Sequence, residues 1–232
     1  MASNIKEWVC GTRMEVGRDV RTKGIADPST LWTAGKDVHI GFLGGSNKLR
    51  DRVFATAQRW TIGGVGGANL VFKRADDDAT ADIRVAFDAG GGSWSHVGTG
   101  ARSIAAGNPT MNLGWATEDL DETPFSSVVL HEFGHAIGLL HEHNHPNLDL
   151  RWKKDVVYSD LCAAPNNWSK GEVDFNVFEQ YPPNRVVMSA QPDLVSIMIY
   201  TIPASWLDGQ AAIMPSDTLS MDDIQFIQGL YP

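Results

Sequence analysis

The histidines in the second half of the chain constrain its fold more than any other feature. Five of the seven histidines lie between residues 131 and 145, and the first three belong to the segment HEFGHAIGLLH at 131–141. This segment has the pattern HExxHxxGxxH. With the composition of this chain, chance gives that pattern with a probability on the order of 10⁻⁵, so the motif is highly specific.

The spacing of the first two histidines places them on one face of a helix. Residues four apart in an α-helix are separated by about 40° around the axis and by one turn along it. The imidazoles of His131 and His135 can therefore bind the same ion at the ~2.0–2.1 Å of a zinc–nitrogen bond. Glu132 lies beside this pair, close enough to contact a metal-bound water without being a ligand.

His141 cannot join this pair on a continuous helix. A continuing helix would place it about 120° away from the metal face and about 9 Å further along the axis. The helix must therefore end and the chain must reverse, and Gly138 tolerates the left-handed backbone conformation of such an end. The spacing predicts that His131, His135 and His141 bind one zinc ion and leave an open coordination position.

Two simpler interpretations of the histidines are a surface cluster and a closed structural zinc site. Structural zinc sites usually have four Cys or His ligands and need no adjacent acid. Here three histidines come with no nearby cysteine and with a carboxylate placed to activate water, which favours a catalytic site. His143 and His145 follow without helical or return spacing, and we do not expect them to bind the metal.

Composition sets the broad class of the protein. The chain has 232 residues, 43% of them hydrophobic and 20% charged, which indicates one sizeable folded domain or two joined lobes and excludes intrinsic disorder. A net charge of −9 gives no general attraction to nucleic acid or anionic lipid, so we expect neither partner. We expect a monomer.

No apolar run approaches the ~20 residues of a membrane span, and the N-terminus lacks the apolar core of a signal peptide. The expected location is therefore the cytoplasm for the chain as written, or outside the cell if a leader has been removed. The two cysteines, Cys10 and Cys162, are too few for a disulfide framework and leave open whether they pair.

Hydrophobic periodicity predicts several elements. Alternation predicts a strand at 37–43, and helical spacing predicts a helix that Ser46 caps and that ends near Ile62. Further expected elements are strands at 69–73 and 81–87, an active-site helix from Pro124 or Phe125 to Gly138 with Thr123 as its cap, and a final helix near 220–229. Residues 1–36 are expected to form an irregular arm or a pro-segment.

With these motifs the chain resembles the metzincin zinc endopeptidases, and the astacin-type branch most. HExxHxxGxxH is the metzincin signature, and SIMIY at 196–200 fits the family's Met-turn. Glu142, directly after the third histidine, gives the astacin form of the motif. The resemblance extends from about Val38 to Tyr231, with looser matches at 92–98 and 109–114, which resemble the edge strand and its neighbour, and at 219–231, which resembles the closing helix.

The resemblance implies an α+β fold with two lobes. The upper lobe, 37–138, would hold a twisted, mostly parallel sheet with an antiparallel edge strand and the active-site helix. The irregular lower lobe, 139–232, would hold the third zinc ligand, the Met-turn and the closing helix. Astacins have two disulfides, whereas this chain has at most one.

The resemblance also assigns roles to single residues. Met198 would lie beneath the three histidines, with Gly138 and Glu142 as structural residues of the site. Tyr200 would bind the zinc and donate a hydrogen bond to the oxyanion; the alternative is a core tyrosine in an apolar strand. An extended polypeptide substrate would bind by strand addition along the edge strand at Ser93, Trp94, Ser95, His96, Val97 and Gly98.

The predicted function is that of a zinc-dependent endopeptidase in which a metal-bound water attacks the peptide bond and Glu132 is the general base. The alternatives are a zinc hydrolase acting on a non-peptide or peptidoglycan amide and an inactive metal-binding module. One zinc ion is the expected cofactor; calcium is not indicated, because the acidic run 76–78 lacks the ligand spacing of a calcium loop. Cys10 could ligate the zinc as a latency switch, but the residues around it favour a free or buried thiol.

Overall fold

The computed structural model describes residues 25–164, 166–214 and 216–232. Cys10 lies outside the described residues. The hypotheses of a zinc switch and of a Cys10–Cys162 disulfide both involve this residue and stay predictions. None of the helices in the described ranges is long and apolar enough to cross a bilayer.

A five-stranded sheet forms the upper lobe, in the order β3-β2-β4-β6-β5. The first four strands in this order are parallel, and β5 is antiparallel at the outer edge, as predicted. The strands are β2 (Asp37–Phe42), β3 (Val71–Arg74), β4 (Ile83–Ala86), β5 (Ser93–Ser95) and β6 (Met111–Leu113).

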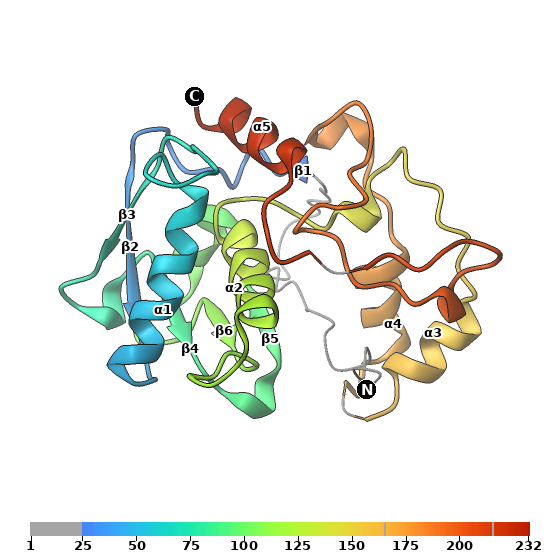
Figure 1. Ribbon diagram of the computed structural model, residues 1–232, viewed down its shortest axis with the longest axis horizontal. Helices are drawn as coiled ribbons and strands as arrows, with labels where there is room; N and C mark the ends of the chain where they lie inside the picture. Colours follow the sequence, from blue (N-terminus) through green and yellow to red (C-terminus); the bar gives the residue numbers. More distant parts are fainter. Residues whose placement is uncertain (1–24, 165, 215) are drawn as a thin grey trace.

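Two helices, α1 (Asn47–Ala57) and α2 (Glu122–Ala136), run side by side over the sheet (Figure 1). Ser46 caps α1 as predicted, because its side chain accepts a hydrogen bond from the Leu49 amide at 3.2 Å. Helix α1 ends at Ala57, earlier than expected, and a 3₁₀ turn at Gln58–Trp60 continues the chain.

The predicted start of the active-site helix is wrong. Helix α2 begins at Glu122, and Asp121 occupies the N-cap position without a side-chain hydrogen bond. Thr123, the expected cap, lies inside the first turn and its hydroxyl donates to Asp217, 94 residues further along the chain. Pro124 fits this earlier start, since the first turn of a helix tolerates proline.

The lower lobe is mostly irregular and has its own apolar core, built by Val157, Leu161, Val173, Trp206 and other buried side chains. Its helices are short: α3 (Lys154–Leu161), α4 (Lys170–Val173) and a π-helical turn at Asp174–Phe178. In Figure 1 α3 and α4 lie on the side of the molecule away from the sheet.

The closing helix α5 (Met221–Leu230) forms where the sequence predicts it, with a capping box between Ser220 and Asp223. Its position differs from the expected one. Ile227 and Tyr231 are buried in the core of the upper lobe, together with Met198 of the Met-turn. The sequence shows that this helix has an apolar face but not which lobe that face contacts.

Residues 25–32, here called the strap, connect the two lobes. Strand β1 (Ile25–Ala26) pairs with β7 (Val187–Met188) of the lower lobe, and Ala26 also bridges to Leu139, just after α2. The part of the expected N-terminal arm from residue 25 onward is therefore integrated into the fold.

The far end of the strap binds the C-terminal end of α2. The Trp32 indole nitrogen donates to the Ala136 carbonyl at 2.8 Å, and the Trp32 amide donates to the Tyr231 hydroxyl at 3.2 Å. The same hydroxyl donates to the Ile137 carbonyl at 2.6 Å. Tyr231 thus joins the strap to the end of the active-site helix.

Replacing Tyr231 by Phe should lower the free energy of unfolding by about 1–3 kcal/mol, because a buried donor and a buried acceptor lose their partner. Urea denaturation at a fixed zinc concentration measures this change. The matched control is Tyr158→Phe, because the Tyr158 hydroxyl bonds the exposed Asp174. The free energy of unfolding of this control should change by no more than about 0.5 kcal/mol. Equal losses in the two variants would contradict the role given to Tyr231.

Candidate active site

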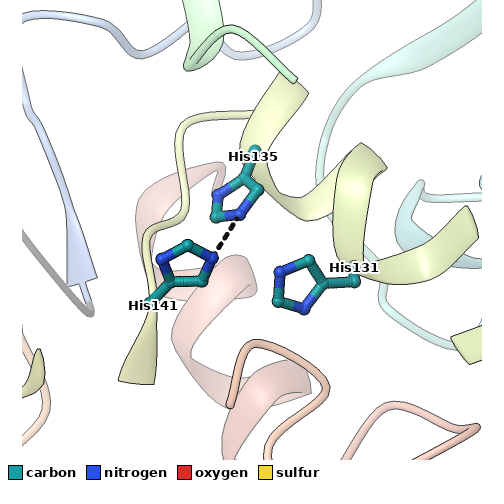
Figure 2. Close-up of side chains that lie close together, drawn as sticks. All are labelled: His131, His135 and His141. Atoms are coloured by element: carbon teal, nitrogen blue, oxygen red, sulfur yellow. Dashed lines mark hydrogen bonds between the residues drawn. The ribbon is translucent and has the colours of Figure 1, made fainter. Parts of the chain in front are cut away.

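The first two histidines of the motif lie on α2 and point to the same side of the helix (Figure 2). His135 is fully buried and His131 retains 9% exposure. The helix ends at Ala136, and Gly138 follows with φ +99°, the left-handed conformation that the spacing predicts. A side chain at Gly138 would also meet Leu31 of the strap, since a Cβ there would lie 2.7 Å from the Leu31 Cδ2.

The chain reversal brings His141 back to the pair. The Nε2 atoms of His135 and His141 lie 3.0 Å apart, as the dashed line in Figure 2 shows. One nitrogen from each of the three rings lies within 4.8 Å of the other two. The predicted ligand set is therefore assembled.

Hydrogen bonds to backbone carbonyls orient two of the rings. Nδ1 of His131 lies 2.8 Å from the Ile197 carbonyl, and Nδ1 of His135 lies 2.8 Å from the Leu139 carbonyl. A carbonyl only accepts, so both Nδ1 atoms carry the proton and both Nε2 atoms present a lone pair. The Nε2 of His131 is buried and has no hydrogen-bond partner among the described residues. A cation between the three rings would satisfy that atom.

Burial also sets the charge state of these rings. It lowers the pKa of His131 to about 4 and holds the pKa of His135 well below its ordinary value. Both rings are therefore neutral at pH 7, which is the form that binds a metal. The donor set fits zinc, which takes three imidazole ligands and keeps a fourth position open in catalytic sites.

The Met-turn lies directly against the helix that carries the ligands. Met198 is buried, and its sulfur occupies the space beside Gly134, where any Cβ would collide with it. The Ile197 carbonyl, one residue earlier, is the acceptor for His131. The glycine at position 134 of HEFGH therefore makes room for the Met198 sulfur, a reason that the motif alone does not show.

Asp223 of α5 fixes the Met-turn, a role that the sequence analysis missed. Its buried carboxylate accepts from the Ser196 hydroxyl at 2.6 Å and from the Ile197 amide at 2.9 Å. It also accepts from the Ser220 amide and so caps its own helix. The Ser220–Asp223 spacing indicated the cap, but nothing in the sequence indicated the bonds to the Met-turn.

Glu142 is buried next to His141. Its amide donates to the Met198 carbonyl at 3.0 Å, and its carboxylate accepts from the Asp193 amide at 2.9 Å. Burial raises the pKa of Glu142 to about 7. These contacts fit the structural role that we predicted for this residue.

Glu132 and Tyr200 are the two further candidates for chemistry. Glu132 is 1% exposed and directly follows His131 on α2. The Tyr200 ring lies 4.3 Å from the His141 ring and 6.2 Å from the His131 ring, measured between centroids. Tyr200 therefore borders the histidine cluster and is also part of the lower core.

The predicted substrate strand is β5, the outermost strand of the sheet, and α2 packs against it. Its regular part ends at Ser95, and Gly98 has φ +48° where the strap comes close: the Thr99 amide donates to the Thr30 carbonyl at 2.7 Å. The six residues assigned to substrate binding, Ser93, Trp94, Ser95, His96, Val97 and Gly98, are all buried. Ile202 and Trp206, which follow Tyr200 in the chain, lie in the lower core.

Known proteins share this arrangement. No protein-family model matches the chain. A solved structure of myroilysin has a TM-score of 0.84 at 39% identity, over 90% of this chain and 98% of that one. A curated relative, zinc metalloproteinase dpy-31 of Brugia malayi, is 25% identical over 223 residues, 93% of this chain. The chain belongs to the astacin-type metzincin zinc metalloendopeptidases.

Other comparisons agree with this assignment. Zinc metalloproteinase nas-24 of Caenorhabditis elegans is 38% identical over 69 residues, 30% of this metzincin. The hatching-enzyme zinc protease of the medaka Oryzias latipes shares the fold, with a TM-score of 0.53 at 16% identity. The metzincin chain described here spans 34% of the length of dpy-31 and 15% of that of nas-24.

The contact between Gly134 and Met198 gives a test of the site. Gly134→Ala should weaken zinc binding at least about tenfold and destabilise the fold by about 1–3 kcal/mol, because the new methyl group displaces the Met198 sulfur. Chelator competition measures the first effect and urea denaturation the second. Adding Met198→Ala should restore part of both.

The matched control is Gly229→Ala in α5, a helical glycine whose Cβ would meet nothing within 4 Å. That variant should be as stable as the wild type or about 1 kcal/mol more stable, with unchanged zinc affinity. If Gly134→Ala behaved like Gly229→Ala, the close packing of the Met-turn against α2 would be refuted.

Proposed function

We propose that this protein is a zinc-dependent endopeptidase that hydrolyses internal peptide bonds of polypeptides. The observation that carries the proposal is the convergence of three imidazole nitrogens next to the buried Glu132. His131, His135 and His141 would hold the metal. The family, whose named relatives are zinc metalloproteinases, supports the same conclusion.

Bound zinc supplies Lewis acidity, which lowers the pKa of a coordinated water to near 7 and polarises the scissile carbonyl. The carboxylate of Glu132 would take the proton from the attacking water and deliver it to the leaving amine nitrogen. Its position on α2, one residue after His131, would hold the carboxylate in a fixed place beside a metal bound by that histidine. Its burial excludes bulk water from the proton transfer.

Tyr200 would act on the carbonyl oxygen of the peptide group that is cleaved. Its hydroxyl would donate a hydrogen bond to the carbonyl oxygen as negative charge develops there, and it would serve as an additional metal ligand when no substrate is bound. Support comes from the place of its ring, 4.3 Å from that of His141.

The substrate would lie extended along β5 and add a strand to the sheet. Two features support this mode of binding: β5 is one of the two edge strands of the sheet, and α2, which carries His131 and His135, packs against it. In strand addition, recognition would come from the backbone groups of β5. Backbone recognition suits a protease that accepts many sequences.

A hydrolase of peptidoglycan or other non-peptide amides would need the same catalytic residues, so the choice between substrates depends on the relatives. Those relatives are named proteinases, which favours polypeptide. An inactive metal-binding module has no need of a buried carboxylate beside the ligands, and Glu132 is such a carboxylate.

Glu132→Gln should reduce kcat/KM for casein hydrolysis by about 10³-fold or more, because the general base is lost while the ligands remain. Zinc content, measured by atomic absorption, should stay stoichiometric. The control on the same helix is Glu122→Gln, whose carboxylate pairs with Arg52 at the surface and which should retain full activity. Activity that survives Glu132→Gln would disprove the proposed mechanism.

Treatment with 1,10-phenanthroline should abolish casein hydrolysis, and added zinc should restore it. Removal of the metal should also lower Tm, because a ligand that binds only the folded state stabilises it by RT ln(1 + [L]/Kd), about 4 kcal/mol at a thousandfold excess over Kd. Calorimetry with and without zinc measures the shift. An unchanged Tm together with unchanged activity would show that the three histidines hold no functional metal.

A further inference from the structure

His143 is a buried histidine just beyond the third ligand, and the mechanism above gives it no role. It lies in the 3₁₀ turn Glu142–Asn144, which directly follows His141. Three rings surround it: those of Tyr200, of Trp152 and of His141, whose centroid is 5.1 Å away.

The ring of His143 is held in a fixed plane. Its Nε2 lies 3.0 Å from the Asn176 carbonyl in the π-helical turn, and since a carbonyl only accepts, this nitrogen carries a proton. Trp152 stands edge-on to the ring at 6.5 Å, and Phe178 packs on Trp152 at 5.5 Å. The lower lobe therefore anchors His143 from behind.

The face of this fixed ring lies against Tyr200. The two centroids are 4.2 Å apart and the planes differ by 25°, which is a stacked arrangement. Tyr200 also contacts His141, at 4.3 Å and 52°. The phenol ring is thus in contact with a metal ligand and with a histidine anchored to the lower lobe.

We propose that His143 is a positioning residue for Tyr200: its ring is the plane that holds the phenol beside His141. This inference rests on the proposed function, in which the Tyr200 hydroxyl acts on the substrate. The hydroxyl is at the far end of the side chain, so a small rotation of the ring moves it by a large distance. A displacement of about 1 Å can cost up to 10²-fold in rate.

Another interpretation is that His143 only fills space in the lower core. The two readings differ in what they require of a replacement. A space-filling residue can be any apolar side chain of similar size, whereas a positioning plane requires an aromatic ring. A direct role as a metal ligand through Nε2 is incompatible with the bond to the Asn176 carbonyl.

The test compares His143→Phe with His143→Leu. Both variants lose the hydrogen bond to Asn176, and only the first keeps a flat ring against Tyr200. His143→Leu should lower kcat for a peptide substrate about tenfold with KM within about twofold, and His143→Phe should stay within about twofold of the wild type. In a Tyr200→Phe background, His143→Leu should lower kcat less than about twofold, because the hydroxyl to be positioned is already absent.

Crystal structures of the two zinc-free variants give a readout that does not depend on activity. The Tyr200 ring should be displaced in His143→Leu and unmoved in His143→Phe. An unmoved ring in His143→Leu, equal kcat values for the two variants, or the full loss in the Tyr200→Phe background would each overturn the proposal. A failure of the endopeptidase function itself would show separately, as the absence of casein hydrolysis by the zinc-loaded wild-type protein.

Discussion

The structure depends on the convergence of three imidazoles in a buried place. Burial keeps His131 and His135 uncharged, and the hydrogen bonds of their Nδ1 atoms leave the Nε2 lone pairs directed into a shared space, an arrangement that is unfavourable until a cation lies there. Rings in such an arrangement would turn away if nothing held them. The residues around the cluster therefore have to fix each ring from behind, and the hydrogen bonds of the two Nδ1 atoms do so.

The groups that fix the rings come from distant parts of the chain. Leu139 provides its carbonyl because the chain reverses at Gly138, and the strap and Tyr231 brace that reversal from outside. The carbonyl of Ile197 comes from the Met-turn, which Asp223 of α5 holds in place. The closing helix therefore packs with the upper core and not with the lobe that precedes it in sequence.

The sequence predicted the parts of the molecule in which local pattern decides the structure. The local pattern predicted strands β2, β3 and β4, the resemblance to the metzincins implied β5, β6 and α5, and the spacing of the motif predicted the ligand set with its turn at Gly138. The predicted start of α2 was wrong because the Thr123 hydroxyl bonds Asp217. A partner 94 residues away cannot be recognised from the local sequence pattern. The contacts of the strap and of Asp223 were not predicted for a related reason. Backbone groups supply many of them, and almost every residue type has these groups.

These supports differ in how close they lie to the chemistry, and different measurements should therefore detect them. Tyr231 bonds the end of the helix and touches no ligand ring, so its contribution appears mainly in the stability of the fold. Asp223 accepts a hydrogen bond from the Ile197 amide, and the Ile197 carbonyl accepts one from the ligand His131. Metal affinity should therefore depend on Asp223. His143 contacts Tyr200 directly, so the turnover rate is the property that depends on it most. Substitutions at Tyr231, Asp223 and His143 should therefore have their largest effects on three different properties, because a different tertiary contact is lost in each case.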